Sequence, residues 1–186
     1  LGPQGTGGFL ITDRLAESMD TLISGGTGSL SEYEEQPPYM PDKFEAGTLN
    51  LPGIYGLHAA LGYIERIGVK SIREKELLLT EMLLEGLCNI KGVHIAGLKG
   101  TDGRTAVVSA DFKGCDNAEV AYRLDKYYGI KTRCGLHCAP SAHRTLNTFP
   151  QGTVRFSPGH FNTREDIETT LLAVNQILKE LGGTSR

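Results

Sequence analysis

In the first part of the chain, hydrophobic positions recur with no clear period, and glycine and proline are frequent. Residues 23–50 match neither a helix nor a strand pattern, so we predict that they form one long ordered loop. A loop of this length within a compact domain usually serves a function. A short apolar run at residues 9–12 follows a glycine-rich turn and predicts a buried strand.

A helical pattern begins at residue 51, and Pro52 is suited to its first turn. The apolar residues that recur on one face of this helix are Ile54, Leu57, Leu61 and Ile64. A second helix is predicted over residues 71–87, because apolar side chains again repeat at helical spacing. Its predicted core face is formed by Ile72, Leu79, Met82 and Leu83.

Two further helices and four strands are predicted in the second part of the chain. Asp116 is a suitable N-cap for a helix over residues 117–128. The last helix runs to residue 181, before two glycines, and begins with one of two capping boxes. These alternatives are Thr163-x-x-Asp166 and Asn162-x-x-Glu165. Short apolar runs predict strands at residues 93–96, 105–110, 130–133 and 153–157.

Short strands and helices in mixed order predict an α+β domain over residues 66–186. Residues 1–65 are expected to be the end of a different part of the protein. The chain opens on Leu1 within a glycine-rich turn, so we expect it to be a fragment of a longer protein.

Composition narrows the classes of function. The 186 residues carry a net charge of -3, and the basic residues are scattered, which argues against nucleic acid or an anionic membrane as partner. No run of 18 apolar residues and no export signal is found. Four cysteines are too few for a disulfide scaffold. A cytoplasmic protein with reduced thiols is therefore expected.

The densest group of reactive side chains lies at residues 133–143. Cys138 stands between His137 and Arg133, and nearby cations stabilise the thiolate form that acts as a nucleophile. A small buried hydrophobe is an equally good interpretation of a cysteine after a strand.

A zinc site competes for the same segment, because Cys134, His137, Cys138 and His143 are all suitable ligands. Adjacent residues rarely point at one ion, and no second pair of cysteines follows. We therefore expect no metal.

Five other residues, in three segments of the chain, are candidates for anion binding. Glycine-rich loops can bind phosphate through backbone N–H groups, which makes Gly25, Gly26 and Thr27 candidates, although a plain turn explains them equally well. Thr48 precedes a helix N-terminus, where it could bind phosphate or simply cap the helix. Arg155 in a half-buried strand needs a carboxylate or phosphate partner, unless it faces solvent.

Five motifs occur in an order typical of one enzyme family. They are GPQGTG at residues 2–7, GGTG at 25–28, FEAGTLN at 44–50, RCGLHCA at 133–139 and VRFS at 154–157. In these motifs the chain resembles the C-terminal part of a cysteine desulfurase, or the closely similar selenocysteine lyase, within the class V aminotransferase homologues.

The resemblance implies a homodimer of fold-type-I subunits, here represented by the C-terminal small domain and the tail of the large one. It also implies pyridoxal 5'-phosphate (PLP) as cofactor, bound as a Schiff base by a lysine that would stand before Leu1. None of the lysines in the chain stands in the expected His-Lys context. We therefore expect the chain alone to be inactive.

The resemblance assigns a role to each candidate residue. Cys138 is implied to attack the sulfur of the substrate and become a persulfide, with His137 as a proton shuttle or thiolate partner. Arg155, assisted by Arg133, is implied to bind the substrate carboxylate. Thr48 is implied to reach the PLP phosphate of the neighbouring subunit.

Other assignments complete this hypothesis. Gly25, Gly26 and Thr27 are implied to line the same phosphate entrance as Thr48. Cys134 has no assigned role, and a redox pairing between Cys134 and Cys138 stays open.

The expected activity is conversion of L-cysteine to L-alanine, with a sulfur-acceptor protein as a further partner. Two alternatives remain at this point. One is another class V enzyme, such as an aminotransferase or an epimerase. The other is a non-enzymatic α+β module that binds a metal or a protein through the segment from Cys134 to His143.

Overall fold

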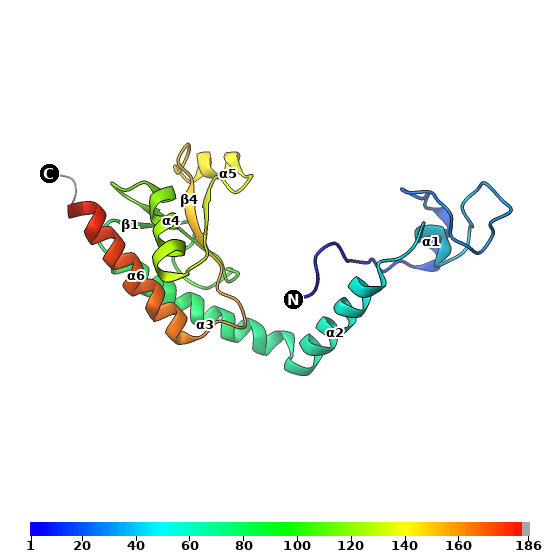
Figure 1. Ribbon diagram of the computed structural model, residues 1–186, viewed down its shortest axis with the longest axis horizontal. Coiled ribbons are helices and arrows are strands. Elements are labelled where there is room, and N and C mark those ends of the chain that lie inside the picture. Colours follow the sequence, from blue (N-terminus) through cyan, green and yellow to red (C-terminus); the bar gives the residue numbers. More distant parts are fainter. Residues whose placement is uncertain (184–186) are drawn as a thin grey trace. The chain divides into compact units, whose positions relative to one another are not determined.

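The computed structural model describes residues 1–183 and divides into two compact units, Leu1–Gly68 and a second that begins at Val69 (Figure 1). Each unit is described by itself. The assignment of the first unit to a larger domain stays a prediction. Within the described residues, no helix is long and apolar enough to cross a membrane.

The first unit contains two α-helices and one 3-10 helix, which are α1 (Asp13–Ser18), α2 (Leu51–Ile67) and η1 (Asp42–Phe44). The predicted buried strand at residues 9–12 is wrong. Phe9 is 62% exposed, Leu10 is fully exposed, and residues 1–68 form no strand that could pair with this run. The Phe9 ring instead makes an edge contact with Phe44, at 5.5 Å between centroids.

The loop predicted over residues 23–50 is confirmed, with η1 as its one short helical turn. Side chains hold it in place. The Gln36 side chain accepts from the N–H of Gly25 at 3.1 Å and donates to the carbonyl of Asp42 at 2.7 Å. Lys43 Nζ donates to the carbonyl of Ala16 at 2.6 Å. The loop is therefore ordered without regular structure.

Helix α2 begins as the sequence predicts. The Asn50 side chain caps it by accepting from the N–H of Gly53 at 3.1 Å. The predicted burial of its apolar face is only partly met, since Ile54 is 42% and Leu61 is 56% exposed. The described residues of this unit leave that part of the face uncovered.

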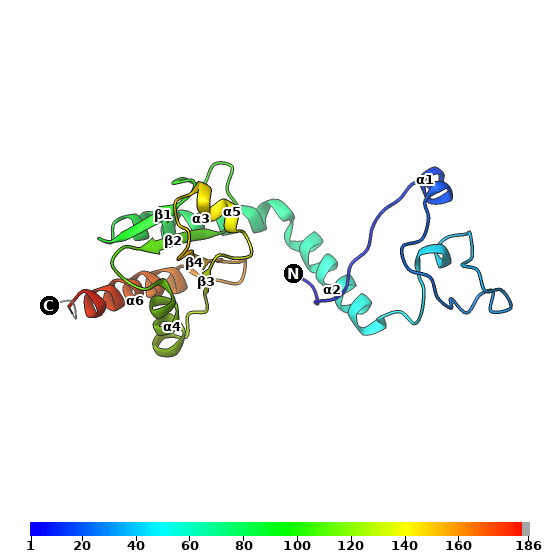
Figure 2. The same cartoon turned by 90° about the horizontal axis from the view of Figure 1, so that it is seen from above.

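The second unit is an α+β domain, as predicted. Its helices are α3 (Val69–Cys88), α4 (Asn117–Tyr128), α5 (Pro140–Thr145) and α6 (Arg164–Gly183). Its strands are β1 (Val93–Ala96), β2 (Val108–Phe112), β3 (Arg133–Gly135) and β4 (Thr153–Phe156). The strands form one antiparallel sheet in the order β1-β2-β4-β3. Helices α3 and α6 contact each other and run in the same general direction (Figures 1 and 2).

Alternation along the strands produces the core. Val108, Ala110 and Phe112 of β2, with Val154 and Phe156 of β4, are buried on one side of the sheet. They pack with apolar residues of α3, α4 and α6 in a single cluster. Intervening strand residues face the other side, which leaves that side free for polar chemistry.

Capping explains why the helix predictions in this unit succeed. The Asp116 side chain accepts from the N–H of Ala118 at 2.8 Å, as expected of the N-cap of α4. At α6, the N–H of Asp166 donates to Thr163 Oγ1 at 3.2 Å, and the N–H of Thr163 donates to Asp166 Oδ2 at 2.9 Å. The first of the two predicted capping boxes is therefore the one that forms.

Two strands begin later than predicted, for local reasons. The Arg104 side chain donates to the carbonyls of Gly100 and Val107, which holds the chain in a turn until β2 starts at residue 108. The N–H of Ile130 donates to the carbonyl of Leu124 at the end of α4, so β3 starts only at residue 133.

Candidate active site

The candidate active site lies on the connection between β3 and β4, at residues 136–152. Gly135 and Thr153 are partners in the sheet, so the two ends of this loop meet. Gly152 has a φ of +74°, and a Cβ there would lie 2.2 Å from the carbonyl oxygen of Gly135. Glycine is therefore required at this base, since any side chain would collide with the facing backbone.

Two arginines stand next to each other at the base of the loop. Arg155 pairs in register with Arg133 on one side and with Ser109 on the other, on the face turned away from the core. Like charges directly opposite each other are unfavourable unless an anion joins them. Among the described residues neither arginine has an ion pair, and the buried Nε of Arg155 has no hydrogen-bond partner. The pair fits a carboxylate.

Cys138 is exposed, and its Sγ lies 3.8 Å from Arg133 Nη2. His137 and Cys138 have φ values of +52° and +59°, in the left-handed region that residues with a side chain rarely adopt. Each such residue costs of order 1–3 kcal/mol, so the surrounding contacts must hold it there. A strained turn thus presents the thiol beside a guanidinium.

His137 precedes Cys138 in the chain, and its ring interacts electrostatically with both arginines. Its Nε2 is 3.3 Å from the hydroxyl of Thr153, and its buried Nδ1 has no partner among the described residues. Burial lowers the pKa of His137 from its ordinary value, and electrostatic interactions with Arg155, His143 and Arg133 lower it further. The imidazole is therefore neutral at neutral pH and can accept a proton.

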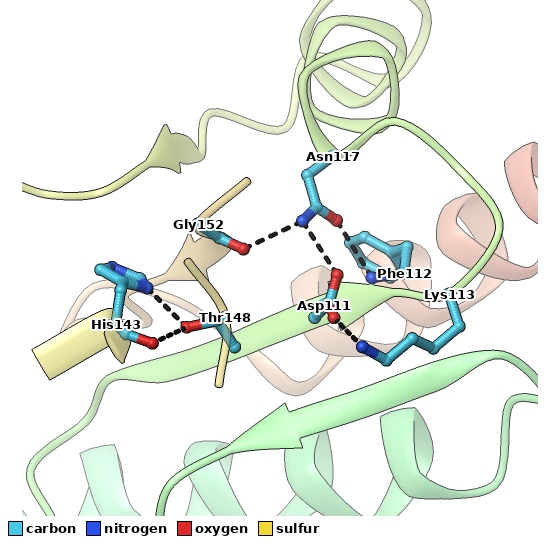
Figure 3. A network of polar contacts seen from close by, with 7 residues as sticks. All are labelled: Asp111, Phe112, Lys113, Asn117, His143, Thr148 and Gly152. Atoms are coloured by element: carbon cyan, nitrogen blue, oxygen red, sulfur yellow. Dashed lines mark hydrogen bonds and ion pairs between the residues drawn. The ribbon is translucent and has the colours of Figure 1, made fainter. Parts of the chain in front are cut away.

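A buried histidine holds the far part of the loop. His143 Nδ1 lies 2.7 Å from Thr148 Oγ1, and both side chains are buried (Figure 3). The His143 ring also lies 5.6 Å from the His137 ring, between centroids. The sequence predicted His143 only as a possible zinc ligand and gave no role to Thr148. Their contact forms only once the chain turns after α5, so residue types alone do not indicate it.

Asn117 links the loop to the sheet, and sequence reasoning missed it too. Its Nδ2 donates to Asp111 Oδ1 at 3.0 Å and to the carbonyl of Gly152 at 3.1 Å (Figure 3). Its Oδ1 accepts from the N–H of Phe112 at 3.0 Å. Asp111 also pairs with Lys113. The sequence contains one signal for Asn117: it is a polar residue in the first turn of α4, directly after the Asp116 cap.

Cys134 points away from this site. It pairs with the buried Val154, whereas its neighbour Arg133 faces the open side. Burial raises the pKa of the Cys134 thiol, and the charge of Asp116 adds to this. All four cysteines are free thiols. Among residues 1–183, no group of three or more His, Cys, Asp or Glu side chains is arranged to hold a metal ion.

The phosphate candidates all lie in the first unit. The N–H of Gly25 is occupied by Gln36, and Thr27 Oγ1 lies 2.9 Å from Ser29 Oγ. The carbonyl of Gly26 accepts from the N–H of Gly47 at 2.8 Å, which brings the two glycine motifs together. Thr48 is exposed two residues before the Asn50 cap of α2. The positive end of a helix dipole at this point favours an anion.

Thr6 stands at the same helix start. A Cβ added at Gly53 in the first turn of α2 would lie 2.4 Å from Thr6 Oγ1, so this hydroxyl packs directly on the helix backbone. Among the described residues, Thr6 Oγ1 is buried with no hydrogen-bond partner. An orphaned hydroxyl beside a helix N-terminus fits the donor chemistry that a phosphate group needs.

Comparison with known proteins gives consistent results. The family model "Aminotransferase class-V" matches residues 1–170. A protein of Methanothermobacter thermautotrophicus named as a probable cysteine desulfurase is 33% identical over 98% of the chain. One of Pyrococcus abyssi with the same name is 34% identical over 97% of the chain. The chain spans about half the length of these relatives, 45% in both cases.

Solved structures agree with the sequence matches. The cysteine desulfurase CsdA of Escherichia coli, in its S-sulfonic acid form, has a TM-score of 0.75 and 26% identity. That match covers 90% of this chain and 41% of the other. The apo cysteine desulfurase of Thermococcus onnurineus has a TM-score of 0.70 and 36% identity, over 75% of this chain and 34% of the other.

Proposed function

Because the chain belongs to the aminotransferase class-V family, we propose that it forms part of a PLP-dependent cysteine desulfurase. This enzyme converts L-cysteine to L-alanine and keeps the sulfur as a persulfide on Cys138. The observation that carries the proposal is the exposed Cys138 thiol beside Arg133, next to Arg155, which has no ion pair among the described residues. The names of the relatives support the same reaction.

The two arginines bind the substrate carboxylate. Arg155 is the more buried of the two residues, and its buried Nε lacks a partner among the described residues, so it forms the main contact. Arg133 completes the site from the neighbouring strand. A carboxylate between them removes the repulsion of the two cations, which explains why like charges are tolerated there.

PLP fits the phosphate candidates of the first unit. Thr48 offers a hydroxyl near the N-terminus of α2, with Thr6, Gly26 and Thr27 nearby along the same loops. Gly25 shapes the loop, since its N–H already donates to Gln36. When bound, PLP supplies the electron sink that weakens the bond between carbon and sulfur in the substrate.

Sulfur transfer then needs a nucleophile and a base from this chain. His137 is neutral at neutral pH and accepts the proton of the Cys138 thiol. The Cys138 thiolate attacks the substrate sulfur, so one S–S bond forms and the C–S bond breaks. The electron pair of the broken bond stays with the substrate carbon, which takes up a proton. The products are L-alanine and a Cys138 persulfide.

The remaining assignments are proposals of the same kind. Cys138 is exposed, which a persulfide needs in order to reach a sulfur-acceptor protein. Thr48 serves the neighbouring subunit of a homodimer. The cytosol is the proposed compartment, and four free thiols support it.

The test uses the full-length protein incubated with PLP and L-cysteine, with alanine and sulfide measured. Cys138→Ala is expected to lower alanine formation at least about a hundredfold, because the sulfur has lost its acceptor. Cys88→Ala, which removes another exposed thiol, is the control and keeps full activity. Absence of both products from the unmodified protein with cofactor bound would refute the proposal.

An aminotransferase or epimerase is the second candidate, because the matching family model bears the aminotransferase name. Neither reaction needs a thiol nucleophile. Transamination or racemisation that survives Cys138→Ala would favour this candidate. The same assay with selenocysteine, with selenide measured, would separate a selenocysteine lyase from a desulfurase.

A further inference from the structure

The loop that carries Cys138 has a second fixed point, away from its base. His143 is 6% exposed, and its Nδ1 lies 2.7 Å from Thr148 Oγ1 (Figure 3). The N–H of Thr148 also donates to the carbonyl of His143, at 2.9 Å. Side chain and backbone together therefore close the turn that follows α5.

This fixed point connects directly to the thiol. The N–H of His143 donates to the carbonyl of Ala139, at 3.2 Å, and Ala139 follows Cys138 in the chain. The N–H of Ala139 donates in turn to the carbonyl of Leu136, at 2.8 Å, across the strained turn. On its other side, the His143 ring lies against the ring of His137.

The strained turn needs such support. His137 and Cys138 both have positive φ values, a region that residues with a side chain rarely adopt, and here two adjacent residues adopt it. A turn of this kind relaxes to ordinary φ values unless its surroundings prevent it. Relaxation would move Sγ away from Arg133, which lies on the neighbouring strand β3.

We propose that His143 and Thr148 are positioning residues that hold the Cys138 thiol beside Arg133. The proposal deepens the proposed function, because it concerns the residue assigned there as sulfur acceptor. His143 and Thr148 touch neither substrate nor cofactor in this assignment. They act through the backbone of Ala139 and the ring of His137.

The test measures the rate at which iodoacetamide alkylates Cys138 in the 186-residue chain at neutral pH, by mass spectrometry of peptides. Cys88, exposed at the end of α3, is the internal reference. Thr148→Val keeps the shape of the side chain and removes the hydroxyl. It is expected to lower the ratio of Cys138 to Cys88 rates about three- to fivefold, because the thiolate loses its cation.

Thr148→Ser is the matched control, because it restores the hydroxyl without the methyl group. It is expected to return the ratio to the original value. An unchanged ratio in Thr148→Val would overturn the proposal. A ratio that stays low in Thr148→Ser would also overturn it, since packing of the methyl group would then be the cause. If Thr148→Val unfolds by circular dichroism, His143→Gln takes its place with the same expected fall.

A double-mutant cycle separates positioning from general loosening of the loop. Arg133→Gln removes the cation while the loop stays closed, and it is expected to lower the ratio by the same factor. Thr148→Val added to Arg133→Gln should then lower it no further, because the contact is already lost. If the double variant instead lowers the ratio by the product of the two single factors, the proposal is refuted. No cofactor or L-cysteine takes part, so this result is independent of the alanine and sulfide assay.

Discussion

His137 shows how the environment of one residue sets its chemistry. From the sequence, either a proton shuttle or a cationic partner of the thiolate was expected. Burial and electrostatic interactions with Arg155, His143 and Arg133 all favour the neutral ring. A neutral imidazole next to Cys138 is a base, whereas the fixed positive charge beside the thiol comes from Arg133.

The lowered pKa of His137 makes stability depend on pH in a defined direction. The folded protein binds the proton less readily than the unfolded chain, whose histidine has the ordinary value of 6.5. Below pH 6.5 the unfolded state therefore holds more protons, and the free energy of unfolding decreases as the pH falls. Above pH 6.5 both states are neutral at this site and the effect vanishes.

Denaturant unfolding at several pH values between 5 and 8 measures this effect. The His137→Asn variant is the control, because it cannot titrate and should lose stability less steeply towards pH 5. In the original chain, NMR should show the His137 ring protonating below pH 6.5. Protonation above 6.5 would contradict the argument.

Residue types alone identified part of the site. Cys138, His137, Arg133 and Arg155 stand out because their chemistry is unusual for their place in the sequence. Thr148 and Asn117 do not, because their roles arise only from folding. Asn117 contacts Gly152, which lies 35 positions further along the chain, and no local pattern encodes such a contact.

At the scale of elements, local rules determine helix ends more reliably than strand ends. The caps at Asp116 and Thr163 use residues within one turn of the helix, so the sequence displays them directly. Strand limits depend on partners elsewhere. The apolar run at residues 9–12 fails as a strand for this reason, since no neighbouring strand exists within residues 1–68.

The close approach of β3 and β4 makes Gly152 a sensitive position. In Gly152→Ala the new methyl group would collide with the carbonyl of Gly135, and the positive φ adds strain. We expect the free energy of unfolding to fall by about 3 kcal/mol or more. The alkylation rate of Cys138 relative to that of Cys88 should also fall, because the base of the loop that carries Cys138 opens.

Gly103→Ala is the matched control for this prediction. Gly103 has a similar φ of +65°, but no atom lies within 4 Å of a Cβ placed there. Only the backbone strain applies, and we expect a loss of about 1 kcal/mol. Denaturant unfolding of both variants measures the difference. Equal losses of unfolding free energy would show that the close contact with the carbonyl of Gly135 adds nothing to the destabilisation.

At the scale of the whole molecule, the two units differ in how much apolar surface they bury. Apart from Pro37 and Gly53, Ala16 is the only apolar residue buried within residues 1–68. The large core cluster lies entirely in the second unit. Since apolar burial must offset the conformational entropy of ordering a chain, the first unit has little to stabilise it by itself.

Hydrogen exchange of the 186-residue chain should therefore be uneven. Amides of β2 and β4 exchange only through unfolding of the second unit, whereas amides of residues 1–50 should exchange at least about a hundredfold faster. The same amides should become protected in the full-length protein with PLP, if Thr48 and the glycine loops meet the cofactor as proposed. Equal protection along the isolated chain would show that the first unit is stable without further contacts. Unchanged fast exchange in the full-length protein would instead count against the cofactor contacts, because a bound phosphate would order the start of α2.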